Sequence, residues 1–403
     1  MEIKPILLSL KQRKAFSTLI VLQVAITLSV MTISALLTRV TLKEWNLPSG
    51  LAHDNIVAVY PQIFDNSVNQ KETVINDLEK LKNLPGVVNA TPTNQIPFSA
   101  EQLTEIRLQE TENAQTFQTS IFDLDENGFD TLNLKLIAGR KITAADVVYN
   151  EQTNQLEPAV VMISQQMAEA LFEKANAIGQ SIIIERGKAP VEVVGVYSNF
   201  MNGERLNFVG QSYRSIIRPR VSYVNGSDPN YLIRVEPGKT EAFLETIRNE
   251  LYQTNGRFIQ QVEFLTRTQK RMYDGRGSRS LLMLFISFIL LFITGLGISG
   301  LISFLVARQK KQIGIRRALG AKRWQIVQYY LVENSIITIV GLILGVGFTI
   351  ALIIFMGGGG NQQIFHAGWM LAIAVFIWLI SITSALSPAI RASKVAPAVV
   401  TRG

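Results

Sequence analysis

The residues best suited to binding an anionic partner lie in one stretch, residues 308–325, which reads RQKKQIGIRRALGAKRWQ. This stretch holds seven Lys and Arg residues and no Asp or Glu, and it lies between two long apolar runs. Guanidinium and ammonium groups bind phosphates, anionic lipid head groups and carboxylates. Three interpretations follow: a nucleic-acid patch, a signal that sets membrane topology, or a docking surface for a partner protein.

Residue types that perform other chemistry are scarce. The chain has no Cys and only two His, His53 and His366, so thiolate metal sites are excluded and a His-based triad or zinc site is not expected. Residues 237–240 (PGKT) resemble the end of a phosphate-binding loop, but Ile233 occupies the position of its first glycine. We expect a turn before a helix there, and no catalytic residue, cofactor site or metal site in this chain.

The apolar runs supply the elements that must hold the basic stretch. A membrane-spanning helix needs about 20 predominantly apolar residues, and four stretches qualify: 16–38, 280–306, 326–356 and 368–390. The first is longer than the apolar region of a signal peptide and lacks a convincing cleavage site, so we interpret it as an uncleaved anchor. The third is long for one perpendicular crossing, and its ends should tilt or project.

Positive charges predict the orientation, because Lys and Arg concentrate in cytoplasmic loops near membrane ends. They lie in residues 1–15, in 307–325 and in the tail 391–403, whereas the connection 357–367 has none. We therefore expect these three basic segments in the cytoplasm, the first as a short interfacial helix. The connection 357–367 and residues 39–279 should lie outside.

The charge balance argues against nucleic-acid binding. Residues 39–279 carry 25 Lys/Arg and 29 Asp/Glu, whereas the rest of the chain carries 14 and 2. The net charge of +8 therefore reflects membrane topology rather than a basic protein surface. A nucleic-acid partner would need basic residues over an extended footprint.

Residues 39–279 mix strand and helix signals typical of an α+β domain. The spacing of apolar residues predicts helices over 74–84 and 239–251. Residues 160–172 begin as a strand and become a helix, with Ser164 at the N-cap.

The β-rich residues 181–199 predict a hairpin in the same segment. Together these elements indicate short βαβ-like units in two subdomains.

Two further stretches carry a family resemblance. Residues 313–345 read IGIRRALGAKRWQIVQYYLVENSIITIVGLILG, and the chain ends SPAIRASKVAPAVVTRG. Both resemble the conserved end of FtsX-like ABC transporter permeases. Residues 128–147 read GFDTLNLKLIAGRKITAADV, and AVVMISQQMAEALF, AIGQSIII and VEVVGVYSN follow. These resemble the periplasmic core domain of MacB-type permeases, so the resemblance covers nearly the whole chain.

The resemblance implies a fold and a mechanism. The fold has four transmembrane α-helices and a large α+β extracytoplasmic (periplasmic core) domain inserted between the first two. The permease is a multi-pass protein of the bacterial inner membrane that works as a homo- or heterodimer by mechanotransmission. Closure of two ATPases moves the helices, and stalks carry that motion to periplasmic domains that expel a substrate such as an antibiotic or peptide. Residues 258–279 correspond to the stalk, although they also suit an ordinary linker.

The resemblance also implies partners. MacB carries an ATPase domain ahead of its first span, whereas 15 residues precede the first span here. We therefore expect a separate ABC ATPase subunit that binds ATP and Mg²⁺, and no cofactor in this chain. A second permease, a periplasmic adaptor, an outer-membrane channel and membrane lipid are the other expected partners.

Two alternative functions remain open. The same architecture serves lipoprotein release or other envelope remodelling, and it also suits a membrane-anchored sensor or scaffold that does not transport. An exporter should bind an adaptor, a lipoprotein-releasing permease a carrier chaperone, and a sensor no ATPase.

The residues expected to contact the ATPase form a short helix within the basic segment. Apolar residues there lie among two arginines and end at a glycine helix stop, a pattern that suits insertion into a groove on a partner. The proposed coupling residues are Ile313, Gly314, Ile315, Arg316, Arg317, Ala318, Leu319 and Gly320. A topology signal or contact with anionic lipid alone is the other interpretation.

Small and charged residues inside the spans complete the candidates. Gly295, Gly297, Gly300, Gly341 and Gly345 are expected to let helices pack closely within or between protomers, although glycine is also tolerated in lipid. Glu333 is the only acidic residue between residue 281 and the C-terminus. We expect Glu333 to pair with Arg or Lys of the basic segment; a role in gating is the alternative.

Overall fold

The computed structural model describes residues 14–45, 47–63, 69–99, 103–111, 114–150, 157–173, 175–185, 189–203, 212–223, 229–252, 257–355 and 367–395. The chain divides into two compact units. One comprises Lys43–Gly275, and the other comprises Met1–Leu42 with Arg276–Gly403. The interfacial helix expected over 1–15 and the connection 357–367 lie almost wholly outside the described residues.

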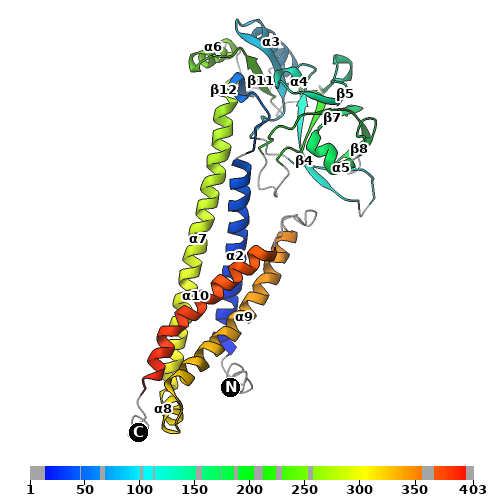
Figure 1. The fold of residues 1–403 in the computed structure, drawn as a ribbon. Coiled ribbons are helices and arrows are strands. Elements are labelled where there is room, and N and C mark those ends of the chain that lie inside the picture. Colours follow the sequence, from blue (N-terminus) through cyan, green and yellow to red (C-terminus); the bar gives the residue numbers. More distant parts are fainter. Residues whose placement is uncertain are drawn as a thin grey trace. The chain divides into compact units, whose positions relative to one another are not determined.

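Half of the first unit is built from two βαβ segments. Its elements are β1 (Ile56–Ile63), α3 (Gln70–Asn83), β2 (Val87–Thr93), β11 (Asn230–Val235), α6 (Glu241–Tyr252) and β12 (Arg257–Phe264). The strands pair antiparallel in the order β12-β1-β11-β2, so each helix connects two strands with a third strand between them. This is the ferredoxin-like arrangement (Figure 1).

The helices of this half follow from their apolar spacing. In α3, Asn69 accepts a hydrogen bond from the N–H of Glu72 at the N-cap, and Val74 and Leu81 are buried one heptad apart. In α6, Leu244, Ile247 and Leu251 are buried at helical spacing. Both helices were predicted from the sequence and are confirmed.

A ring of six strands is inserted between β2 and β11. It comprises β3 (Thr104–Arg107), β4 (Phe117–Leu124), β7 (Val160–Ser164), β8 (Ser181–Ile184), β9 (Pro190–Tyr197) and β10 (Ser215–Ser222). The pairing runs β4-β3-β8-β9-β7-β10, and β10 pairs with β4 to close the ring. Its core contains Ile106, Ile121, Val161, Ile182 and Val193, covered by Met167 and Leu171 of α5 (Gln165–Phe172).

Short elements complete the unit. They are η1 (His53–Asn55), α4 (Gly128–Thr131), β5 (Leu136–Gly139), η2 (Ala144–Asp146) and β6 (Val148–Asn150). The predicted strand-to-helix change at 160–172 is confirmed, because the Ser164 hydroxyl accepts from the N–H of Met167 at the start of α5. The predicted hairpin is the antiparallel pair β8–β9.

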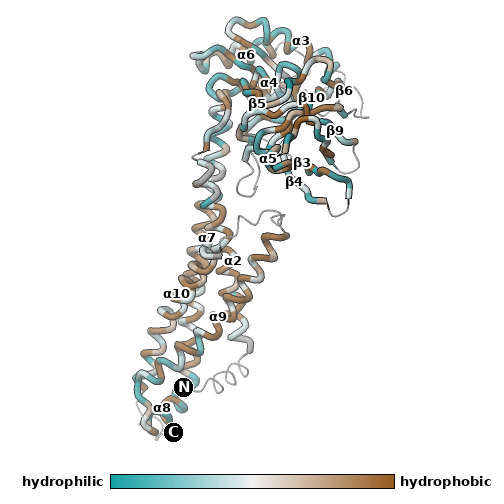
Figure 2. Tube along the Cα trace, turned by 45° about the vertical axis from the view of Figure 1, so that its right-hand side comes forward, coloured by the Kyte–Doolittle hydropathy of each residue, from teal (hydrophilic) through white to brown (hydrophobic). Residues whose placement is uncertain are grey.

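The second unit is helical. Its helices are α2 (Lys14–Trp45), α7 (Leu265–Arg308), α8 (Lys310–Ala318), α9 (Arg323–Phe355) and α10 (Ala367–Ser393), of which α2 and α7 begin or end in the first unit. Four of them, all but α8, are long and apolar enough to cross a membrane. Figure 2 shows the hydrophobic colouring along these helices. Ile20, Val24, Ile298, Ile326 and Ile377 form part of their shared core.

One helix extends well beyond the span expected within it. The stalk was expected over 258–279 and the second span from 280, but residues 257–264 form β12 of the outer sheet, and α7 runs without a break from Leu265 to Arg308. It passes through Gly275 and Gly277, although each glycine costs about 0.5–1 kcal/mol of helix stability relative to alanine. The helix therefore begins before the expected span, and where the membrane boundary falls along it stays a prediction.

Candidate functional site

The basic segment folds as the short helix α8 between α7 and α9. Its end is set by Gly320, whose positive φ of 96° favours glycine. The N–H of Ala321 donates to the carbonyl of Arg316 (3.0 Å), and the N–H of Gly320 donates to the carbonyl of Arg317 (3.2 Å). This pair of bonds is the Schellman helix stop, so the helix end predicted at Gly320 is confirmed.

Three contacts fix α8 on the membrane helices. Ile313 is buried in the core of the helical unit. The hydroxyl of Tyr330 on α9 donates to the side-chain oxygen of Gln309 (2.9 Å). The Arg316 guanidinium lies 4.9 Å from the ring centre of Tyr329, a cation–π contact. These contacts hold α8 against the start of α9.

The remaining apolar residues of α8 stay exposed. Ile315 is 43% exposed and Leu319 83% exposed, and Trp324 in the first turn of α9 is 59% exposed. Lys310 and Lys311 are also exposed. An apolar surface rimmed by cations is typical of a protein-docking site.

The side chains that are exposed on α8 differ from those predicted from the sequence. Ile313, Ile315, Ala318 and Leu319 were expected on one stripe for a partner, but Ile313 and the adjacent Gly314 face the chain's own core. Arg317 donates to the carbonyl of Ala321 (3.1 Å) within the same turn. Trp324 was not singled out from the sequence, although an exposed tryptophan beside a cationic helix was a signal that could have identified it.

Four of the five expected packing glycines lie at close helix contacts within the chain. A β-carbon at Gly341 would lie 2.9 Å from the Val24 side chain, and one at Gly345 would lie 3.0 Å from the backbone of Ala25, both on α2. Gly295 and Gly297 of α7 face Ser384 of α10 and Gln23 of α2. Gly300 has no such neighbour within 4 Å among the described residues.

Glu333 is buried on α9 beside a polar contact between α9 and α10. The amide of the adjacent Asn334 donates to the Ser381 hydroxyl (2.7 Å), which also lies 2.7 Å from the Thr338 hydroxyl. Pairing of Glu333 with a cation of the basic segment stays a prediction.

The first unit, Lys43–Gly275, is called the outer domain below. The base of α7 in this domain holds a buried carboxylate that the sequence did not indicate. Glu263, the penultimate residue of β12, is fully buried. Its carboxylate accepts from the Thr268 hydroxyl (2.8 Å), the Gln261 amide (2.7 Å) and the Arg271 guanidinium. Burial raises the pKa of the nearby Tyr60 hydroxyl, and the negative charge of Glu263 raises it further. Two turns of α7 are thus bound to one strand.

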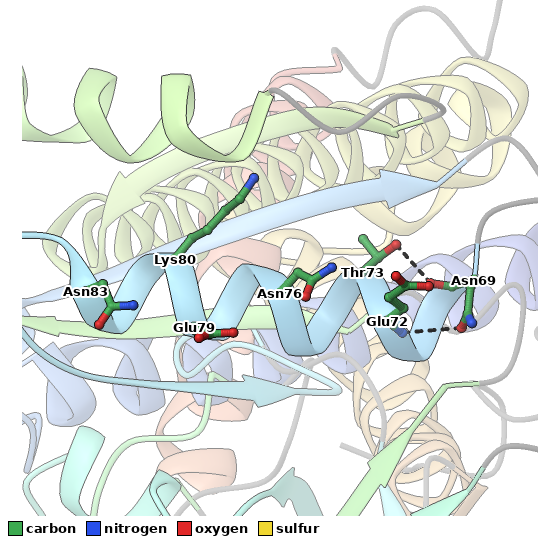
Figure 3. Close-up of a pocket in the computed structure, with 7 residues that line it drawn as sticks. All are labelled: Asn69, Glu72, Thr73, Asn76, Glu79, Lys80 and Asn83. Carbon is green, nitrogen blue, oxygen red and sulfur yellow. Dashed lines mark hydrogen bonds between the residues drawn. The ribbon is translucent and has the colours of Figure 1, made fainter.

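The outer domain also has a polar hollow along α3, shown in Figure 3. Its lining residues are Asn69, Glu72, Thr73, Asn76, Glu79, Lys80 and Asn83. All belong to one helix or its cap, and Asn69 is engaged in capping that helix. No group of three or more Asp, Glu or His that could hold a metal ion occurs among the described residues.

Two families match the chain in adjoining parts. The family described as MacB-like periplasmic core domain matches residues 19–250, and the one described as FtsX-like permease C-terminal matches residues 284–397.

Similar proteins include one named as an ATP-binding/permease protein and one named as a permease. The macrolide export ATP-binding/permease protein MacB of Aggregatibacter actinomycetemcomitans is 27% identical over 235 residues, which cover 56% of this chain and 34% of that protein. The uncharacterized ABC transporter permease YknZ of Bacillus subtilis is 25% identical over 337 residues, which cover 80% of this chain and 77% of that protein. The match thus spans about a third of MacB.

Two solved structures are similar at low identity. The periplasmic region of MacB from Actinobacillus actinomycetemcomitans is 18% identical, with a TM-score of 0.34 over 55% of this chain and 94% of that one. The extracellular domain of the noncanonic ABC-type transporter YknZ from Gram-positive bacteria is 15% identical, with a TM-score of 0.32 over 51% of this chain and 100% of that one.

Proposed function

The chain belongs to the MacB-like permeases, with a MacB-like periplasmic core domain joined to an FtsX-like permease domain, and on this premise we propose that it is the membrane subunit of an ABC exporter. It couples ATP hydrolysis by a separate ATPase chain to movement of its outer domain, which expels a substrate from the periplasm. ATP and Mg²⁺ bind to the ATPase partner.

The exposed surface of α8 is the observation that carries this proposal. Leu319, Ile315 and Trp324 present apolar area next to exposed cations, while Ile313 and Tyr330 tie the same helix to α9. A groove on the ATPase that took up Leu319 would exclude water from these side chains and shift α8 when it closed.

The remaining parts of the proposal concern assembly. The permease works as a dimer with itself or a related permease, and its termini and α8 lie in the cytoplasm. The outer domain engages a periplasmic adaptor and through it an outer-membrane channel. Motion imposed on α8 passes along α7 to the outer domain, because α7 is one helix from Leu265 to Arg308.

The test is affinity purification of the full chain in mild detergent, with identification of the ATPase that co-purifies. Leu319→Ser should reduce recovery of the ATPase at least tenfold, because it removes the most exposed apolar side chain of α8 without touching the core. Arg316 is a poorer probe, because its loss would also disturb the contact with Tyr329.

The matched control is Leu386→Ser on α10, where the side chain is 37% exposed. This variant should retain the ATPase at the wild-type level. Absence of any ATPase from the wild-type purification would overturn the exporter proposal and favour a sensor. A co-purifying lipoprotein carrier in place of an adaptor would indicate lipoprotein release.

A further inference from the structure

Six hydroxyl residues lie at seven-residue spacing on α2 and α7. On α2 they are Thr27, Ser34 and Thr41, and on α7 they are Ser280, Ser287 and Thr294. The two sets are separated by more than 230 residues of sequence, yet both helices belong to the same unit at these positions and lie side by side (Figure 1).

The first and last hydroxyls pair across the two helices. The Thr27 and Thr294 hydroxyls are 3.0 Å apart, and the Thr41 and Ser280 hydroxyls are 3.2 Å apart. The helices are therefore antiparallel, and equal steps of seven from either pair bring Ser34 opposite Ser287. These three pairs are called the hydroxyl ladder below.

The middle rung differs from the outer two. Ser287 donates to the carbonyl of Met283 in its own helix (2.7 Å), and Thr27, Thr41 and Thr294 can likewise donate to the carbonyls four residues before them (2.8, 2.9 and 2.8 Å). Of the six, only the buried Ser34 hydroxyl has no hydrogen-bond partner among the described residues. The middle rung is therefore complete in composition but not hydrogen-bonded between the helices in this conformation.

Seven-residue spacing has a mechanical meaning. An α-helix has 3.6 residues per turn, so positions seven apart stay on a seam with a partner helix only when the two helices coil gently around each other. Hydroxyl residues at such a seam are small and allow close approach. The seam continues toward Gln23, whose side-chain oxygen lies 3.0 Å from where a β-carbon on Gly297 would stand.

The ladder also restricts sliding. The pairs are restored only after a shift of seven residues, which is about 10.5 Å along the axis. A shift of one turn would separate both hydroxyl pairs and bring bulkier side chains such as Leu291 to the seam, where small residues allow close approach.

We propose that the hydroxyl ladder locks α2 and α7 in a single register, so that they move as one two-helix strut and do not slide past each other or separate. The locked register does not depend on the proposed function, whereas its persistence during ATP turnover rests on the proposed function.

The chain has no Cys, so paired cysteines report this register directly. Ser34→Cys with Ser287→Cys and Thr41→Cys with Ser280→Cys are the in-register pairs. Ser34→Cys with Ser280→Cys and Ser34→Cys with Thr294→Cys join ladder positions that are one heptad out of register. A disulfide needs α-carbons closer than about 7 Å, which a 10.5 Å offset does not allow. All four variants are oxidised in native membranes and analysed by gel mobility after cleavage between the two helices.

The in-register pairs should cross-link at least tenfold more than the out-of-register pairs. Equal cross-linking of both sets, or none in register, would overturn the locked register. This arm needs no ATPase, so it remains decisive if the exporter proposal fails.

The second arm tests persistence during turnover with the co-purified ATPase and Mg-ATP. Cross-linked Ser34→Cys/Ser287→Cys should retain at least half of the ATP hydrolysis rate of the reduced sample, and ATP should not create out-of-register cross-links. Loss of hydrolysis that returns on reduction would show that the helices must separate, and would overturn the strut.

Discussion

At the residue scale, Asp146 collects four hydrogen bonds in the outer domain. Its carboxylate accepts from both terminal nitrogens of Arg140 (2.7 and 2.9 Å) and from the N–H (2.8 Å) and hydroxyl (2.7 Å) of Thr143. The hydrogen bonds from Arg140 hold the pKa of this carboxyl well below its usual range, although partial burial opposes them. The ionised form therefore fastens the turn that leads into β6.

Asp146→Asn should lower the local stability of residues 140–147 by about 1 kcal/mol at pH 7, because the charged acceptor at this cap is lost. A depressed pKa contributes stability above the unfolded value of about 3.9 and loses it as the pH falls toward the folded value. The difference between wild type and variant should therefore shrink below about pH 3.9. Hydrogen-exchange protection of this segment at pH 7, 5 and 3 measures it, and a pH-independent difference would contradict the assignment.

At the element scale, close packing of α9 on α2 depends on two glycines. Gly341→Ala should destabilise the helical unit by about 1–3 kcal/mol, because the new methyl group would overpack against Val24. Gly347→Ala on the same helix is the control, since nothing lies within 4 Å of its β-carbon position among the described residues. That variant should be neutral or gain up to about 1 kcal/mol of helix propensity. Thermal unfolding in detergent compares the two, and equal effects would argue against this contact.

A second prediction at this scale concerns the attachment of α7 to β12. Glu263→Gln should weaken the first two turns of α7 by about 1–3 kcal/mol, because a buried charged acceptor is replaced by a neutral amide. Amide exchange of residues 265–273 should accelerate accordingly. Glu241→Gln is the matched control: its pair with Arg267 (3.2 Å) is more than half exposed on both sides and should contribute at most about 1 kcal/mol. Equal acceleration in both variants would remove the special role of Glu263.

Local signals predicted some elements well. Ser164 before an apolar helix pattern located α5, and Gly320 located the end of α8, because both depend on backbone groups a few residues away. The apolar runs predicted the four long helices for the same reason. The apolar run that predicted the second span does not extend to the polar first turns of α7, so it did not reveal that the helix begins at Leu265.

Non-local features could not be predicted from the sequence in the same way. Closure of the ring by β10 on β4 joins residues about 95 apart, and no local pattern specifies that partner. Burial of Glu263 likewise depends on how β12 and α7 meet. Ile313 is buried and Leu319 is exposed because of how α8 packs in the helical unit, which apolarity alone does not reveal.

At the scale of the whole molecule, the four candidate spans predict that both termini lie on the same side of the membrane. The basic segment 307–325 follows the second span, so we expect it on that side too and the outer domain on the other. The distribution of Lys and Arg favours the cytoplasm for the termini and α8.

Single cysteines in the Cys-free chain test this topology. A membrane-impermeant maleimide should label the exposed position of Asn83→Cys on α3 from outside intact cells, with any outer membrane made permeable. Lys310→Cys on α8 should react only after the inner membrane is opened. Labelling of Lys310→Cys in intact cells would reverse the orientation and with it the proposed docking of an ATPase.

The hydroxyl ladder also limits how the lengths of α2 and α7 can change in evolution. One residue inserted between Ser280 and Ser287 would turn Ser280 by about 100° away from Thr41 and displace it by about 1.5 Å. Only an insertion of seven residues, matched by seven between Ser34 and Thr41, would restore every rung. Homologues that retain these hydroxyls should therefore differ in length in their loops, and within these two helices only by paired heptads.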